Sequence, residues 1–322
     1  MENSRNGNCN TTFGNSATIA IAKHLEKMLA RETGVILDRD PEELHQMRVS
    51  MRRLRSAITG FAPALSLPKT ASDRNVGKIA RILGKLRDID VLQAELQDKY
   101  QPLLPQAEQK SLEKALKILA KKRKLAYQEV TRTFKRKAYQ DLKKDLNSWL
   151  EKPQYQQVGN IGIERVLPDL LSPQVGKFLL HPGWWLGIKA GQEFDSAAVE
   201  TILEREEAIL HDLRKEAKRS RYNMELFTDF YGDSYQKYVK KIKKVQEVLG
   251  EIQDCFILKE FFKELFGSNF EKKLPTLVKL IAEKRYQKWL EWLEIQQEFL
   301  KSETRQELRS LVLHPSQELI LA

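Results

Sequence analysis

Apolar residues recur at every third or fourth position through most of this chain, with charged residues between them. The pattern is clearest between Asp40 and Gly60, where five apolar residues follow a 3-4-3-4 spacing and would share one face of a helix. These residues are Leu44, Met47, Met51, Leu54 and Ile58. No segment of convincing length alternates apolar and polar residues as a half-buried strand does. The pattern therefore predicts an all-α protein.

Capping residues, prolines and glycines divide this pattern into separate helices. Asp40 followed by Pro41 is a start signal, because Asp caps the helix and Pro suits its first position. Gly60 to Pro63 is a stop signal. Similar reasoning predicts helices over residues 16–31, 41–60, 72–99, 106–150, 163–171, 174–180, 195–227, 235–266 and 274–313.

Two segments of the chain resemble each other, residues 42–55 and residues 208–221, at an offset of 166 positions. The matched pairs are His45 and His211, Arg48 and Arg214, Arg52 and Lys218, Arg53 and Arg219, and Arg55 and Arg221. The same offset relates residues 83–92 to residues 249–258. We therefore predict an internal duplication that builds two quasi-equivalent bundles of antiparallel helices.

The basic residues of each occurrence form a line beside the apolar one, about 100° around the helix. These two basic lines are His45, Arg48, Arg52 and Arg55, and His211, Arg214, Lys218 and Arg221. Arg53 and Arg219 point roughly 100° away from them. Because each line borders a buried line, we expect it at the rim of a groove between helices. Its cations recur about every 5 Å, which favours a linear polyanion over a single compact phosphate.

The next helix of each half adds further cations to this expected groove. They are Lys78, Arg81 and Lys85 in the first half and Lys240 and Lys244 in the second. The 166-residue offset replaces Arg81 by Glu247 and Lys85 by Glu251. The second half is therefore expected to contribute less from this helix.

Composition agrees with a polyanionic partner without requiring one. The 322 residues include 55 Lys and Arg against 44 Asp and Glu, a formal net charge of +11. Only Cys9 and Cys255 are present, which fits a reducing cytoplasm and argues against a disulfide framework. No run approaches the ~20 apolar residues of a membrane span. We expect a cytoplasmic protein.

Composition shifts along the chain predict its domain organisation. Residues 1–15 are Asn-rich and predict a disordered tail. Residues 16–152 form the predicted first bundle and 195–322 the second. Residues 153–194, with several prolines and glycines, form a connector with short helices.

The repeated His-x-x-Arg-x-x-x-Arg/Lys-Arg-x-Arg pattern resembles the CHAD family, the conserved histidine α-helical domain. A second hallmark, from Leu83 to Leu92, is echoed from Leu249 to Leu258. The resemblance covers most of the chain after the tail. It implies two helical bundles related by a pseudo-twofold axis, and binding of inorganic polyphosphate along a basic surface. Association with polyphosphate granules would follow from such binding.

The two histidines leave several roles open: donation to phosphate, a structural hydrogen bond to a neighbouring helix, or metal binding. Glu42 precedes His45 with the spacing of di-iron bundles, but Ala208 stands at the matching place, so we predict no metal. Asp88 and Asp254 are matched acids that we expect to orient an arginine such as Arg55 or Arg221 by an ion pair.

Gly84 and Gly250 lie within helices, where Gly costs up to ~1 kcal/mol. We expect these two glycines to permit a close approach of helices.

Motifs of the known catalytic classes are missing from the sequence. Lys85 and Lys177 each follow a glycine but lack the earlier glycine of a P-loop, and no zinc or nucleophile-elbow motif occurs. We therefore predict a non-enzymatic protein without cofactors that binds polyphosphate, or another polyanion, in a basic groove between its two helical halves. A nucleic-acid-binding protein and a metal-dependent phosphohydrolase remain the alternatives.

Overall fold

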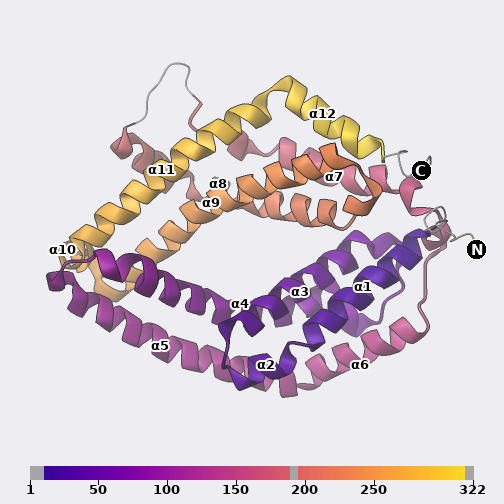
Figure 1. Cartoon of the computed structure of the whole chain (residues 1–322), viewed down its shortest axis with the longest axis horizontal. Coiled ribbons are helices and arrows are strands. Elements are labelled where there is room, and N and C mark those ends of the chain that lie inside the picture. Colours follow the sequence, from indigo (N-terminus) through magenta and orange to yellow (C-terminus); the bar gives the residue numbers. More distant parts are fainter. Residues whose placement is uncertain (1–10, 189–194, 316–322) are drawn as a thin grey trace, which may run out of the picture. The chain divides into compact units, whose positions relative to one another are not determined.

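The computed structural model describes residues 11–188 and 195–315, and no strand occurs within these ranges (Figure 1). The predicted all-α class is confirmed. Its α-helices are α1 (Phe13–Leu29), α2 (Glu32–Leu37), α3 (Pro41–Gly60), α4 (Asp73–Glu95), α5 (Gln106–Lys135), α6 (Lys137–Glu151), α7 (Leu167–Leu179), α8 (Ser196–Glu225), α9 (Asp233–Phe266), α10 (Phe270–Lys273), α11 (Pro275–Leu300) and α12 (Ser302–Leu313).

These helices form two compact units that are not the contiguous bundles expected from the sequence. Among the described residues, the first unit comprises 11–94 and 118–167, and the second comprises 95–117, 168–188 and 195–315. The predicted first bundle, residues 16–152, thus contributes residues 95–117 to the second unit, and the predicted connector, residues 153–194, is divided between the units. The internal duplication stays a prediction.

In the first unit, α1 and α3 lie side by side (Figure 1). The apolar line predicted on α3 is buried along its whole length, from Leu44 to Ile58. Facing residues on α1, among them Ile21, Leu25 and Met28, are buried as well. This packing fixes the rotation of α3, so its basic line must point away from α1.

The N-terminal ends of α1 and α3 can be compared with the predictions. The carboxylate of Asp40 accepts a hydrogen bond of 2.8 Å from the Glu42 N–H, which confirms the predicted N-cap of α3. Helix α1 begins at Phe13, so the predicted tail of residues 1–15 extends too far. The hydroxyl of Thr12 caps this helix, and Phe13 packs against Phe61 with ring centroids 5.5 Å apart. Residues 1–10 of that tail lie outside the described residues.

Two predicted helix boundaries were wrong. The helix expected over residues 106–150 is interrupted at Arg136, whose backbone is extended between α5 and α6. The side-chain amide of Gln140 donates to the carbonyl of Phe134 at 2.6 Å, which satisfies the end of α5. Conversely, α7 continues through Pro173 where two short helices were expected, because its buried face outweighs one lost hydrogen bond.

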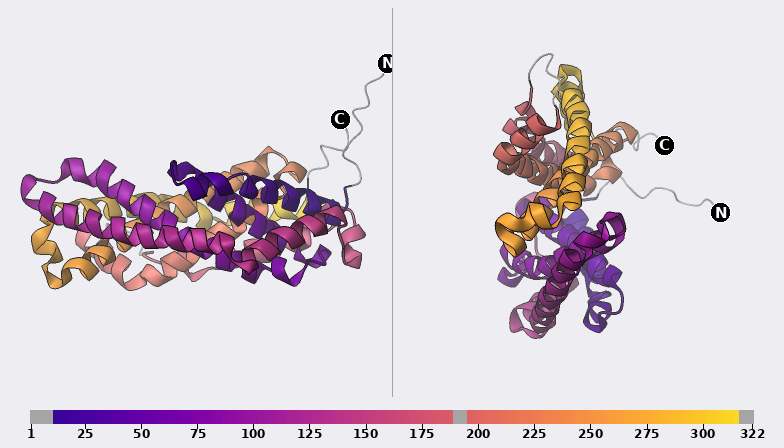
Figure 2. Two further views of the ribbon diagram at one scale, coloured as in Figure 1. Left: turned by 90° about the horizontal axis from the view of Figure 1, so that it is seen from below. Right: turned by 90° about the vertical axis from the view of Figure 1, so that its left-hand side faces the viewer.

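In the second unit, α9 packs against both α8 and α11 (Figure 2). The core includes Trp289 and Trp292 of α11, and Trp184 stacks on Trp292 with ring centroids 5.2 Å apart. Arg285, also on α11, is 1% exposed and forms an ion pair with Glu200. Charged groups therefore contribute to the interior of this unit. Among the described helices, none has the length and apolarity needed to span a bilayer.

Burial of His24 in α1 makes the first unit sensitive to acid. The side chain is 8% exposed, and burial, followed by the charge of Arg53, lowers its pKa from 6.5 to about 4. The folded state therefore favours the neutral imidazole of His24. The protein keeps its full stability above pH 6.5 and loses part of it as the pH falls toward 4. At pH 5 the loss amounts to about 2 kcal/mol.

We expect His24→Leu to remove this part of the acid sensitivity. Urea unfolding followed by circular dichroism at pH 8 and pH 5 would show a smaller difference in unfolding free energy for the variant than for the wild type. His314→Leu, on an exposed residue after α12, is the control. Equal pH dependence in wild type and His24→Leu would contradict the assignment.

Candidate anion-binding site

A groove with a volume of about 420 Å³ lies between α3 and α4 in the first unit. Its lining residues are Arg48, Arg52, Arg55, Gly77, Ala80, Arg81, Gly84, Lys85 and Asp88. Five of these side chains are cationic and one is a carboxylate. Three arginines come from the basic line of α3, and Arg81 and Lys85 come from α4. The groove thus brings together five of the cations that the sequence singled out.

Small residues of α4 form the wall against which the arginines lie. A Cβ placed on Gly84 would be 2.6 Å from the Nη1 atom of Arg48, and one on Gly77 would be 3.2 Å from the Cζ atom of Arg55. Gly84 was expected to allow close approach of two helices. The nearest atoms are instead those of a guanidinium, so this glycine makes room for an arginine side chain.

Two carboxylates accompany the arginines of α3. Arg55 donates to Asp73 from both Nε and Nη2, the latter at 3.0 Å, and these side chains are 45% and 40% exposed. Asp88 lies 3.6 Å from the Nη2 atom of Arg48 and is 76% exposed. Asp88 therefore pairs with Arg48 rather than with Arg55. Exposed pairs of this kind contribute little to stability, typically about 1 kcal/mol or less.

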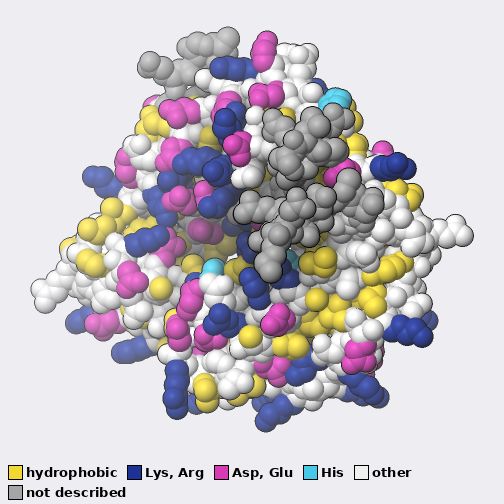
Figure 3. Space-filling view, turned by 45° about the vertical axis from the view of Figure 1, so that its right-hand side comes forward, with side chains coloured by type: hydrophobic (Ala, Val, Ile, Leu, Met, Phe, Trp, Pro, Cys, Tyr) yellow, Lys and Arg dark blue, Asp and Glu magenta, His cyan; other side chains and the backbone are white. Residues whose placement is uncertain are grey.

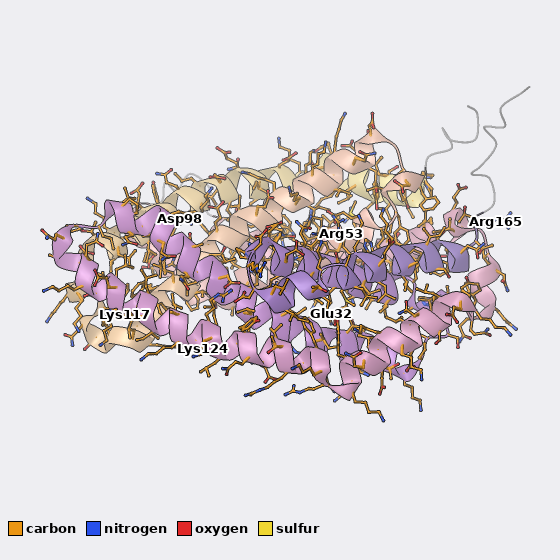
Figure 4. The ribbon with its side chains drawn as sticks, turned by 60° about the horizontal axis from the view of Figure 1, so that its bottom comes forward. Glu32, Arg53, Asp98, Lys117, Lys124 and Arg165 are labelled. Carbon is orange, nitrogen blue, oxygen red and sulfur yellow. The ribbon has the colours of Figure 1, made fainter. Side chains whose placement is uncertain are left out.

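The other candidates of the first unit lie outside this lining. Lys78 is exposed on α4 and His45 is half-buried on α3. Among the described residues, Lys78, Arg81 and Lys85 have no ion-pair partner. Arg53 lies on the α1 side of α3, where its charge acts on His24 (Figure 4).

The surroundings of His45 favour its neutral form. Burial lowers the pKa of His45, the charge of Arg87 on α4 lowers it further, and Glu42 opposes the shift. A neutral imidazole can still donate one hydrogen bond. An anion placed beside His45 and Arg87 would raise the pKa of the imidazole and favour its protonation.

In the second unit the matching histidine is hydrogen-bonded within the protein. The Nδ1 atom of His211 lies 2.9 Å from Oε1 of Gln253, the position that corresponds to Arg87. The structural role that the sequence left open therefore applies to the geometry of His211. This contact joins α8 to α9.

Arg214 and Lys218 of α8 face a carboxylate. Burial raises the pKa of Asp254, and the charges of Arg214, and more weakly Lys218, act in the opposite direction. A Cβ on Gly250 would be 3.2 Å from Nε of Arg214. The second unit thus repeats the contact between an arginine and a helical glycine found at Arg48 and Gly84, at the same 166-residue offset.

The remaining cations of the second unit mostly have internal partners. Arg221 has a side chain 10% exposed, donates to Gln246 at 2.9 Å and to Glu225 at 2.6 Å, and lies over the Tyr222 ring. Arg219 pairs with Glu216, and Lys244 pairs with Glu291 at 3.0 Å. Lys240 is exposed, with no ion pair to any residue in the described ranges.

Sequence reasoning missed Gly77 and Ala80, which line the groove, as well as Asp73, which pairs with Arg55, and Arg87, whose charge acts on His45. Gly77, Ala80 and Gly84 recur at helical spacing between the cations of α4. That row of small residues beside a basic line was the available signal. Within the described residues, no group of three or more His, Cys, Asp or Glu side chains could hold a metal ion.

Cationic and acidic side chains are mixed over the one face shown in Figure 3. The groove between α3 and α4 differs because its cations share one concave lining with a single carboxylate.

Comparison with known proteins identifies the fold and the family. The crystal structure of the CHAD domain from the plant Ricinus communis is 22% identical, with a TM-score of 0.59, and the match covers 96% of this chain and 95% of that chain. PptA from Streptomyces chartreusis is 12% identical, with a TM-score of 0.64, and the match covers 89% of this chain and 99% of that chain. At these identities the similarity shows the fold alone. No curated protein matches the chain.

The family model described as CHAD domain matches residues 19–263, which include both occurrences of the histidine and arginine motif. The expected resemblance is thereby confirmed, and the chain belongs to the CHAD domain family.

Proposed function

We propose that the protein binds inorganic polyphosphate without hydrolysing it, and that the groove between α3 and α4 is a binding site. The observation that carries this proposal is the shared lining of Arg48, Arg52, Arg55, Arg81 and Lys85 around one hollow with a single carboxylate. Arginine offers a planar fork of donors that suits phosphate oxygens. Membership of the CHAD domain family supports the same ligand.

The arrangement suits an extended anion better than a compact one. The α3 cations of the groove span Arg48 to Arg55, about 10 Å along the helix axis at 1.5 Å per residue. A single phosphate could contact only part of that line, whereas a chain of phosphates could contact each cation in turn. Aromatic residues for stacking nucleic-acid bases are not among the lining residues. This favours polyphosphate over the nucleic-acid alternative.

Competition between ligands tests the choice of polyanion. Fluorescently labelled polyphosphate would be displaced by unlabelled polyphosphates of graded length and by single-stranded RNA at one fixed salt concentration. We expect polyphosphate to compete better at equal phosphate concentration, and affinity to rise with chain length. Equal competition by RNA would favour the nucleic-acid-binding alternative.

A phosphate-release assay separates binding from hydrolysis. We expect no release of orthophosphate from polyphosphate during incubation with the protein and Mg²⁺. Release that is lost in His45→Ala would instead establish a metal-dependent phosphohydrolase. A cytoplasmic location and association with polyphosphate granules are part of the proposal and require imaging in cells.

Removing two groove cations should weaken polyphosphate binding. We expect Arg52→Ala with Arg81→Ala to raise Kd roughly a hundredfold, because each lost charge-assisted contact is worth about 1.5 kcal/mol. The plot of log Kd against log salt concentration should also become less steep, by about 0.7 for each phosphate no longer neutralised.

The control removes the same charge from elsewhere in the first unit. Lys124→Ala with Lys135→Ala changes two exposed lysines of α5, of which Lys124 is labelled in Figure 4. We expect this control to change Kd by less than about threefold. Equal losses in both double variants would mean that net charge alone drives binding.

Gly84→Ala tests the contact between α4 and Arg48. The added methyl group would meet the Arg48 guanidinium, which is mobile enough to move aside, so the fold should be retained. Ala also favours a helix interior over Gly by up to ~1 kcal/mol. We therefore expect an unchanged or raised Tm together with a several-fold weaker affinity for polyphosphate, measured by calorimetry.

Gly176→Ala in α7 is the matched control, because a Cβ there meets nothing within 4 Å. It should provide the gain in helix stability and leave affinity unchanged. Unaltered affinity in Gly84→Ala would show that the position of Arg48 is unimportant for binding.

A further inference from the structure

The two occurrences of the basic motif differ in what their cations contact. In the first unit, the acids nearest to the α3 arginines are Asp73 and Asp88, which are 40% and 76% exposed. In the second unit, the acids beside the cations are Asp254 and the less exposed Glu216, Glu225 and Glu291, whose side chains are 11%, 26% and 36% exposed.

The clearest divergence is between Arg55 and Arg221, which occupy the same place in the motif. Arg55 has a side chain 45% exposed and lines the groove. Arg221 has a side chain 10% exposed, and its guanidinium is hydrogen-bonded to Gln246 of α9 and Glu225 of α8. Each guanidinium donates two hydrogen bonds within the protein, so the difference lies in burial, which leaves the Arg221 side chain much less accessible to a ligand than that of Arg55.

Lysines at matching places show the same difference, with a lysine that is unpaired within the described ranges in the first unit and an ion-paired lysine in the second. Lys78 is exposed and has no ion-pair partner among the described residues, whereas Lys244 joins α9 to Glu291 of α11. Glu291 also pairs with Lys288, which in turn contacts Glu251. Glu251 stands where the first half has Lys85. An acid has thus replaced a groove cation and entered an ion-pair network.

Helix packing accounts for the difference. The backbones of α8 and α9 approach one another closely along more of their length than those of α3 and α4. Closer packing leaves less room for a ligand between the helices, and it requires that the buried cations be paired.

We propose that the two motifs have divided their roles: the first binds the polyanion, and the second holds α8 to α9 through Arg221, while Lys244 joins α9 to α11. This inference rests on the proposed function and assigns binding to one of its two motifs. Arg221 is then a structural residue of the second unit rather than a ligand contact.

Matched double variants test this division. Arg52→Gln with Arg55→Gln changes the first motif, and Lys218→Gln with Arg221→Gln changes the same two places in the second. We expect the first double variant to raise Kd for long-chain polyphosphate by about tenfold or more. The second should leave Kd within about twofold and lower Tm by about 3 °C or more, because it breaks buried contacts.

A second pair keeps the test decisive if the Arg221 variant does not fold. Lys78→Gln and Lys244→Gln each remove one exposed lysine, so both proteins should remain folded. We expect Lys244→Gln to leave Kd unchanged. Weakening of binding by Lys244→Gln, or by folded Lys218→Gln with Arg221→Gln, to the same extent as by the first-motif variants would overturn the division of roles.

The experiment distinguishes this inference from the function on which it rests. A wild-type protein that does not bind polyphosphate would refute the proposed function. A wild-type protein that binds and loses affinity equally through both motifs would refute the division of roles and leave the proposed function standing.

Discussion

The contact between an arginine of one helix and a glycine of the next determines the geometry of the candidate site. Arg48 lies against Gly84, and Arg55 lies against Gly77. A side chain on either glycine would occupy space that a guanidinium now fills. The missing Cβ atoms let a row of long cationic side chains lie between α3 and α4 without being buried. A concave and positively charged lining is the consequence, although Gly lowers the intrinsic stability of α4.

Such a lining carries an electrostatic cost, because like charges on neighbouring turns of a helix repel one another. Two features reduce this cost. Asp73 and Asp88 each lie beside one arginine, and both are exposed enough for water to screen the remaining charges. Full neutralisation would abolish the attraction for an anion, whereas full burial would require a partner for every cation. The groove lies between these limits, which suits the proposed binding of a strongly charged ligand.

Local sequence patterns predicted the helices of this region well, since burial of one face imposes a period that can be read directly. The apolar line from Leu44 to Ile58 and the cap at Asp40 are examples. Helix ends that depend on single side chains were missed, such as the break at Arg136, where Gln140 bonds the Phe134 carbonyl, and the start at Phe13, which Thr12 caps. The ion-pair partners of individual side chains were predicted least well. Asp73 and Glu291 pair with residues of other helices, and the hydrophobic periodicity of the sequence does not show which residues of different helices lie close together.

The same limitation explains why the two motifs looked equivalent in the sequence. Their basic residues and their glycines keep one spacing, and the structure places Arg48 beside Gly84 as it places Arg214 beside Gly250. The surrounding residues differ: Gln253 replaces Arg87, and Glu251 replaces Lys85. Each change removes a cation near the basic line, and the second adds an acid that pairs with lysines of α11. A cation can contact a ligand only where nearby acids do not already occupy it. The chemistry of a repeated motif therefore depends on the residues around it as much as on the motif itself.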